Sequence, residues 1–155
     1  HRRRCLSTAT PQPTGVLQPM SALTQDRNSR RRDGNQVEPP VAAATRIFGG
    51  AIVCINAAGF AVPGATATTL KAVGVAEQRA DNLSGAAGAI RVRCRKGPHL
   101  FANSAAADAI ALADVGADCF IVDDQTVAKT NGSNTRSVAG KVFDVDADGV
   151  WVDFR

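Results

Sequence analysis

The chain has 155 residues, a net charge of +4 at neutral pH, and hydrophobic residues at 45% of its positions. This length suffices for one domain with its own core, and no apolar run approaches the roughly 18 residues of a membrane-spanning helix. Only 5% of the residues are aromatic and tyrosine is absent, which favours a thin β core over a deep pocket lined with aromatic side chains.

Residues 1–40 are predicted to form an extended basic arm. Residues 1–46 hold eight arginines against three acids, whereas residues 47–155 hold ten basic side chains against eleven acids. Five of the seven prolines also lie in residues 1–40, and proline fixes an extended backbone and removes a hydrogen-bond donor. We therefore expect the arm to be flexible alone and ordered only along a partner surface.

The start of the arm carries a separate expectation. The chain begins with His1, and its one methionine is Met20, which opens the segment MSALTQDRNSRRRDG. We therefore expect residues 1–19 to be upstream or non-native sequence, and the native arm to begin at Met20.

Residues 41–155 are predicted to form a β-rich domain, because short apolar or alternating runs recur every 8 to 12 residues or so between turn signals. A bulge or kink is expected at Gly49-Gly50, a hairpin across Gly97-Pro98, and a second hairpin around residues 146–149. Residues 82–88 and 123–134 are interpreted as loops. The expected strands cover residues 46–56, 60–65, 69–78, 89–97, 99–103, 118–122, 137–145 and 149–154.

Residues 104–116 (SAAADAIALADVG) admit two interpretations. Alanines and a capping Ser104 favour a short helix, whereas Ile110 and Leu112 equally suit a brief strand. The whole pattern predicts an all-β fold: a small β-sandwich or barrel with an extended N-terminal arm and at most one short helix.

The four cysteines suggest no chemistry. Cys5, Cys54, Cys94 and Cys119 form no CxxC pair and have no zinc-binding spacing. Three of them lie in apolar or strand-like runs, which indicates free thiols in a core. Cys94 and His99 are close in sequence, but no third residue is placed to orient a catalytic base.

The acidic motifs are better explained as turns. Residues 144–149 (DVDADG) match the first half of an EF-hand calcium loop, but the twelfth position is Arg155 where a bidentate glutamate belongs. An acidic hairpin turn accounts for the motif. Residues 123–124 similarly suit the end of a strand better than an acid–base pair. We therefore expect no catalytic residue, no cofactor and no metal, and the chain is not expected to be an enzyme.

A basic stripe is predicted on one strand. Arg91, Arg93 and Arg95 alternate with Ile90, Val92 and Cys94, so the arginines should share one face. This face is either solvated or in contact with an acidic partner.

Residues 20–155 resemble the capsid cement, or head decoration, family of tailed bacteriophages. The resemblance lies in the order of five segments: MSALTQDRNSRRRDG, VAAATRIFGGAIVCINAAGFAVPG, LKAVGVAEQRADN, ADVGADCFIVDDQTVAKT and AGKVFDVDADGVWVDF. It implies a structural virion protein on the outer surface of the head, made in the host bacterial cytoplasm. It also implies that the protein stabilises the lattice of the major capsid protein and associates with neighbouring copies, commonly as a homotrimer.

On this interpretation, nine residues are candidates for contact with the capsid or with neighbouring copies: Arg27, Arg30, Arg31, Arg32, Val37, Arg46, Arg91, Arg93 and Arg95. The alternative is a nucleic-acid-binding protein whose basic arm grips phosphates. The body has no recognisable nucleic-acid-binding module, so protein contact is favoured. No membrane partner is expected.

Overall fold

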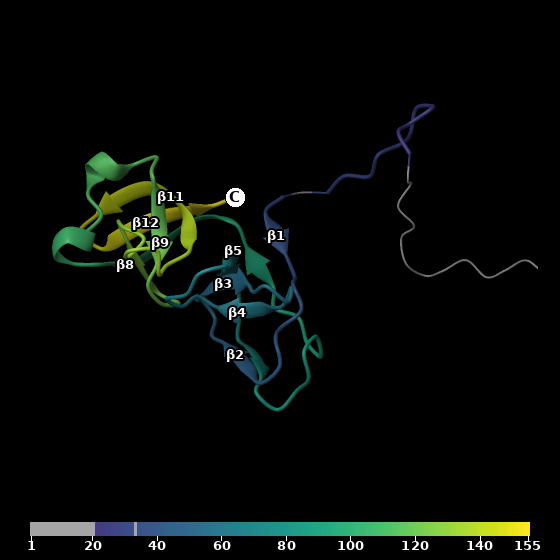
Figure 1. Ribbon diagram of the computed structural model, residues 1–155, viewed down its shortest axis with the longest axis horizontal. Coiled ribbons are helices and arrows are strands. Elements are labelled where there is room, and N and C mark those ends of the chain that lie inside the picture. Colours follow the sequence, from purple (N-terminus) through teal and green to yellow (C-terminus); the bar gives the residue numbers. More distant parts are fainter. Residues whose placement is uncertain (1–20, 33) are drawn as a thin grey trace, which may run out of the picture. The chain divides into compact units, whose positions relative to one another are not determined.

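Figure 1 shows the chain as a computed structural model, which describes residues 21–32 and 34–155. The chain divides into two units, His1–Arg32 and Asp33–Arg155. Residues 21–32 contain neither strand nor helix, and each of them is exposed to solvent. The expectation that residues 1–19 are upstream sequence falls outside the described residues.

The second unit is all-β, as the sequence predicted, and it begins with a five-stranded sheet. The strand order is β1-β7-β5-β3-β4, and all neighbours are antiparallel. A separate ribbon pairs β2 (Thr45–Ile47) with β6 (Ala80–Asn82). The strands of the five-stranded sheet are β1 (Gln36–Val37), β3 (Ile52–Ile55), β4 (Ala61–Pro63), β5 (Lys71–Ala76) and β7 (Cys94–Arg95).

The C-terminal part of the unit is a closed barrel in the order β10-β8-β12-β11-β9 (Figure 1). Closure leaves no strand edge unpaired. The last hairpin turns where Asp146 pairs with Gly149, which confirms the prediction for residues 146–149. The barrel strands are β8 (Gly97–Asn103), β9 (Asp118–Ile121), β10 (Thr126–Ala128), β11 (Val138–Asp146) and β12 (Gly149–Phe154).

Residues 34–40, which were predicted as the end of the arm, are part of the folded unit, so from here on the arm means residues 21–32. Beyond β1, Pro40 forms a bridge with Arg91, and Val41 forms one with Ala61 of β4. The Val41 amide donates to the Ile90 carbonyl at 2.9 Å, and the Ala61 amide donates to the Pro40 carbonyl at 2.7 Å. The compact unit therefore begins at Asp33, earlier than residue 41, because backbone hydrogen bonds hold a segment that has no apolar period.

Two groups of buried side chains form the core, and β3 contributes to both. Ile52 and Cys54 belong to the group that fills the barrel, whereas Val53 belongs to the group beneath the five-stranded sheet. Each of the three is completely buried. Burial on both faces explains why residues 46–56 have a continuous apolar pattern instead of an alternating one. Full burial of one such Ile or Val stabilises the fold by about 1.5–3 kcal/mol.

Hydrogen bonds join the barrel to the loop between β4 and β5. The buried Ser137 hydroxyl donates to the Ala67 carbonyl at 2.7 Å and accepts from the Leu70 amide at 3.1 Å. The Thr66 hydroxyl donates to the Val122 carbonyl at 2.6 Å. These contacts show that Ser137 serves a structural purpose.

Two predicted turns have different roles in the structure. Gly49-Gly50 is a turn between β2 and β3, not a bulge within one strand, and Gly50 has a φ of +85° that favours glycine. The prediction of a hairpin across Gly97-Pro98 is wrong. Strand β7 pairs with β1 and β5, whereas β8 pairs with β12 and β10, so the chain passes there from the sheet to the barrel.

Residues 104–116 form neither a full helix nor a strand. They contain two single-turn 3-10 helices, Ala106–Asp108 and Leu112–Asp114. The Ser104 hydroxyl donates to the Val127 carbonyl instead of capping a helix. Residues 123–134, predicted as loop, contain strand β10. Within the described part of the chain, no helix is long and apolar enough to cross a membrane.

Candidate interaction surface

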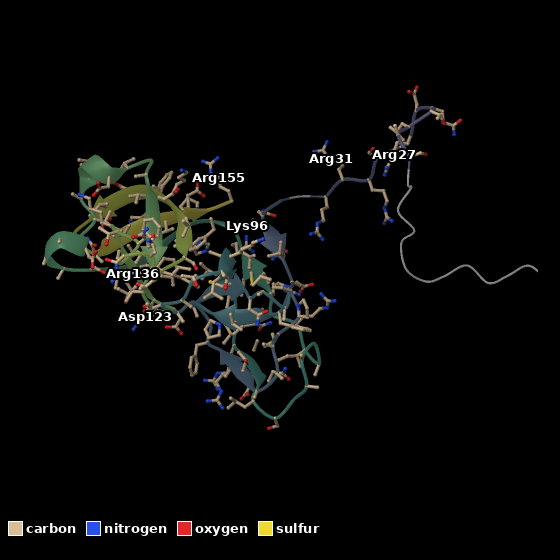
Figure 2. The ribbon with its side chains drawn as sticks, viewed as in Figure 1. Arg27, Arg31, Lys96, Asp123, Arg136 and Arg155 are labelled. Carbon is tan, nitrogen blue, oxygen red and sulfur yellow. The ribbon has the colours of Figure 1, made fainter. Side chains whose placement is uncertain are left out.

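The arm presents positive charge to solvent. Arg27, Arg30, Arg31 and Arg32 are exposed, and residues 21–32 carry only one acid, Asp26. Figure 2 shows the side chains of Arg27 and Arg31 extending from the backbone of the arm. Within residues 21–32, these four arginines take part in no ion pair with Asp26. Such a segment can bind an acidic protein surface or phosphates.

The arginine stripe of the second unit, Asp33–Arg155, contacts Glu38 of the same chain. Arg91, Arg93 and Arg95 are exposed and alternate with the buried Val92 and Cys94, as predicted. The guanidinium of Arg93 lies 3.1 Å from a carboxylate oxygen of Glu38, and Arg91 donates to the backbone carbonyl of the same residue at 2.8 Å.

Glu77, the residue after β5, contacts both the stripe and β1. One of its oxygens pairs with Arg95 at 3.2 Å, and the other accepts from the side-chain amide of Gln36 at 2.7 Å. Desolvation opposes the effect, but the hydrogen bonds from Gln36 and Arg95 and the charges of Arg95 and Arg93 lower the pKa of Glu77. The stripe is therefore largely neutralised within the molecule, which leaves less charge for a partner.

Val37 lies beside the stripe, because β1 pairs with β7 and places Val37 opposite Cys94, whereas Arg46 lies on the separate β2–β6 ribbon. Val37, in β1, is half-buried and packs against the core group beneath the sheet. Arg46, in β2, pairs with Asp81 of β6 at 3.1 Å. The structure thus brings Arg91, Arg93 and Arg95 together but does not bring Arg46 to them.

An aromatic corner on the β2–β6 ribbon is absent from the sequence prediction. The Phe48 ring is 49% exposed, and the guanidinium carbons of Arg46 and Arg79 lie 5.8 and 5.5 Å from its centre. A hollow of about 400 Å³ adjoins it, lined by Phe48, Gly49, Gly50, Ala51, Asp124 and Gln125. Arg79 and Phe48 are distant in the sequence and come together only because β2 pairs with β6. The sequence around either residue therefore could not predict this contact.

Exposed apolar side chains also lie on the barrel and next to it. Phe143 is 57% exposed and lies at an irregularity of β11, between Val142 and Asp144. Val115, which follows the second 3-10 helix, is 47% exposed. Phe143 is the larger of the two, so its contact with a partner is the one to test.

The cysteines and the histidine of the described residues, which are Cys54, Cys94, Cys119 and His99, do not assemble a nucleophilic site. Cys54, Cys94 and Cys119 are free and buried. Burial raises the pKa of Cys54 and of Cys94 to about 12, and that of Cys119 to about 11. His99 Nδ1 lies 3.1 Å from the Gly97 carbonyl, not against a thiol. At neutral pH these thiols stay protonated and therefore unreactive.

The acidic motif of residues 144–149 closes a turn. One oxygen of Asp146 accepts from the Asp148 amide at 2.8 Å, and the other accepts from the Trp151 indole at 3.0 Å. These two hydrogen bonds, that of Trp151 first, lower the pKa of Asp146. Asp123 likewise accepts from the Gln125 amide. Across residues 21–32 and 34–155, no cluster of three His, Cys, Asp or Glu side chains is arranged to hold a metal ion.

No protein-family model matches this chain, and neither a curated protein nor a solved structure matches it significantly. Its functional assignment therefore depends on the residues described above.

Proposed function

We propose that this protein is a cement protein of a bacteriophage head, which binds the outer capsid surface and stabilises the lattice of the major capsid protein. The observation that carries the proposal is the contrast between two basic regions. The arm exposes Arg27, Arg30, Arg31 and Arg32, and Asp26 is the one acid among residues 21–32, whereas Arg93 and Arg95 of the stripe are paired with Glu38 and Glu77. The order of sequence segments over residues 20–155 supports the same role.

The arm suits attachment to a repeating lattice. An extended segment buries much area per residue when it docks, but it loses conformational entropy, so one such contact is weak. A homotrimer that engages several capsid subunits gains affinity through effective concentration. The closed barrel supplies a rigid body without open strand edges, which suits crowding on a surface.

The arm is tested by replacing its four arginines with alanine in the full chain and measuring occupancy on purified heads that lack the protein. We expect weaker binding and unchanged thermal unfolding, because these side chains are exposed and lie outside the core. Replacement of the four by lysine is the matched control, since it keeps the charge. Undiminished occupancy of the alanine variant would contradict the proposal.

The exposed arginines also favour a second candidate function, binding of nucleic acid. It predicts affinity for duplex DNA that falls steeply with salt. Heads emptied of DNA separate the two functions. Cement binding persists on empty heads, whereas the nucleic-acid function predicts duplex binding at low salt and none to the emptied shell.

A further inference from the structure

The loop between β10 and β11 is built around the dipeptide Asn131-Gly132. Gly132, Ser133 and Asn134 follow one another in the left-handed region, with φ of +62°, +60° and +67°. The side chain of Asn131 holds this loop: its Oδ1 accepts from the Asn134 amide at 3.2 Å, and its Nδ2 donates to Asn134 Oδ1 at 2.9 Å.

Two hydrogen bonds connect the backbone nitrogen of Gly132 through Thr130 to the carboxylate of Asp108. The Gly132 amide donates to Thr130 Oγ1 at 3.4 Å, and Thr130 Oγ1 donates to Asp108 Oδ1 at 2.5 Å. Because the hydroxyl proton is directed to Asp108, the lone pairs of Thr130 Oγ1 remain for the Gly132 amide. Asp108 Oδ2 is paired with Arg136 at 3.3 Å, which fixes the carboxylate.

We propose that Asn131 is a site of self-catalysed deamidation. The Gly132 nitrogen releases its proton toward Thr130 Oγ1 and forms a bond to Cγ of Asn131, which closes a five-membered succinimide. The bond between Cγ and Nδ2 breaks, and Nδ2 leaves as ammonia with the transferred proton. Water then opens the ring. Hydrolysis between nitrogen and Cγ yields aspartate, and hydrolysis between nitrogen and the main-chain carbonyl carbon yields isoaspartate.

Each partner in the reaction has a group suited to its part. Glycine leaves the attacking nitrogen free of a shielding side chain. The Asn134 amide, hydrogen-bonded to Asn131 Oδ1, stabilises the negative charge that develops on that oxygen. Thr130 and Asp108 act as a general base for the Gly132 proton. Ser133 and Asn134 are exposed, so water reaches the ring.

The other buried or half-buried asparagines lack this arrangement. Asn56, Asn82 and Asn103 are also held by hydrogen bonds, but alanine, leucine and serine follow them. The reaction also adds a negative charge beside Arg136, whose Nε is buried and has no hydrogen-bond partner among the described residues. The guanidinium of Arg136 also donates to the Thr130 carbonyl at 3.0 Å, so this cation lies against the loop in which the new charge forms.

The proposal is tested on the purified full chain at neutral pH, by peptide mass spectrometry of residues 130–136 and by release of ammonia. We expect the folded chain to deamidate at Asn131 at least as fast as the same chain in denaturant. Thr130→Val should slow the folded rate by about tenfold, since general-base assistance contributes about 10² or more when well aligned and the 3.4 Å contact is long. Its rate in denaturant should not change.

Two variants make the result specific. Thr130→Ser keeps the hydroxyl and should retain the rate. Thr135→Val removes only the hydrogen bond from Thr135 Oγ1 to the Gly132 carbonyl, so it is the matched control. The proposal is overturned if Thr130→Val deamidates as fast as the unmodified chain. It is also overturned if the folded chain is slower than the denatured one, and that comparison decides even where Thr130→Val fails to fold.

Discussion

At the scale of single residues, the thiols have the most definite chemistry. Cys54, Cys94 and Cys119 are each fully buried, and their pKa values lie at about 12, about 12 and about 11. The thiolate is the reactive form, and almost none of it exists near pH 8 in the folded chain. These cysteines therefore fill the core as small apolar side chains do.

We predict that a Cys5→Ser chain shows no reaction with a thiol reagent when folded and three reactive thiols in denaturant. The folded pKa values exceed the ordinary value of 9.0, so the free energy of unfolding stays constant below pH 9 with respect to these groups. It then falls toward pH 12, by at most about 1.4 kcal/mol per pH unit for each thiol. Rapid labelling of the folded chain would disprove this account.

The residue scale also shows what the sequence could reveal. The alternation of arginines with Val92 and Cys94 was sufficient to predict which side chains of residues 91–95 are buried, whereas Ile90 is only half-buried. It was not sufficient to predict the partners of those arginines, because Glu38 and Glu77 are distant in sequence and reach the stripe only through strand pairing. The corner of Phe48 and Arg79 was missed for the same reason.

At the scale of elements, β1 depends on this pairing. It has only two residues, of which Gln36 is held by Glu77, and the residue that follows it, Glu38, is held by Arg93. The pKa of Glu77 is lower in the folded chain than its ordinary value of 4.5. The ionised Glu77 therefore stabilises the folded state above pH 4.5, and this stabilisation is lost as the pH falls. The pairing of β1 with β7 should therefore weaken in acid.

We predict that Glu77→Gln speeds amide hydrogen exchange at Lys96, whose amide donates to the Asn35 carbonyl beside β1. The change should be local, so the Val142 amide, which donates to Ala117 within the barrel, serves as the internal control. Equal exchange at Lys96 in both chains would show that the ion pair does not hold β1.

Elements were predictable where a local pattern determined them. The hairpin of β11 and β12 follows from alternating runs on both sides of a short acidic turn. Strand β10 was missed because its three residues lie between turn residues and are fixed by pairing with β8 and β9. The passage at Gly97-Pro98 resembles a hairpin turn locally, and only the two separate sheets show otherwise.

At the scale of the whole molecule, the proposed function assigns contact with the capsid to the arm and to exposed apolar side chains. Phe143 is the most exposed aromatic residue on the barrel, at 57%. We predict that Phe143→Asp weakens occupancy on heads and leaves thermal unfolding unchanged, because the side chain is not part of the core.

The matched control for this variant is Leu83→Asp, which places the same charge at a 47% exposed residue outside the barrel. Equal loss of occupancy in both variants would indicate a general effect of charge. No loss of occupancy in Phe143→Asp would show that Phe143 is not part of the contact surface.

The most direct test of the proposed cement function is the ratio of this chain to the major capsid protein in intact, purified heads. A lattice-binding protein should copurify at a fixed ratio near that of the capsid protein and should dissociate when the outer surface is disrupted. Absence of the chain from intact heads, or its presence only with the packaged DNA, would contradict the proposal.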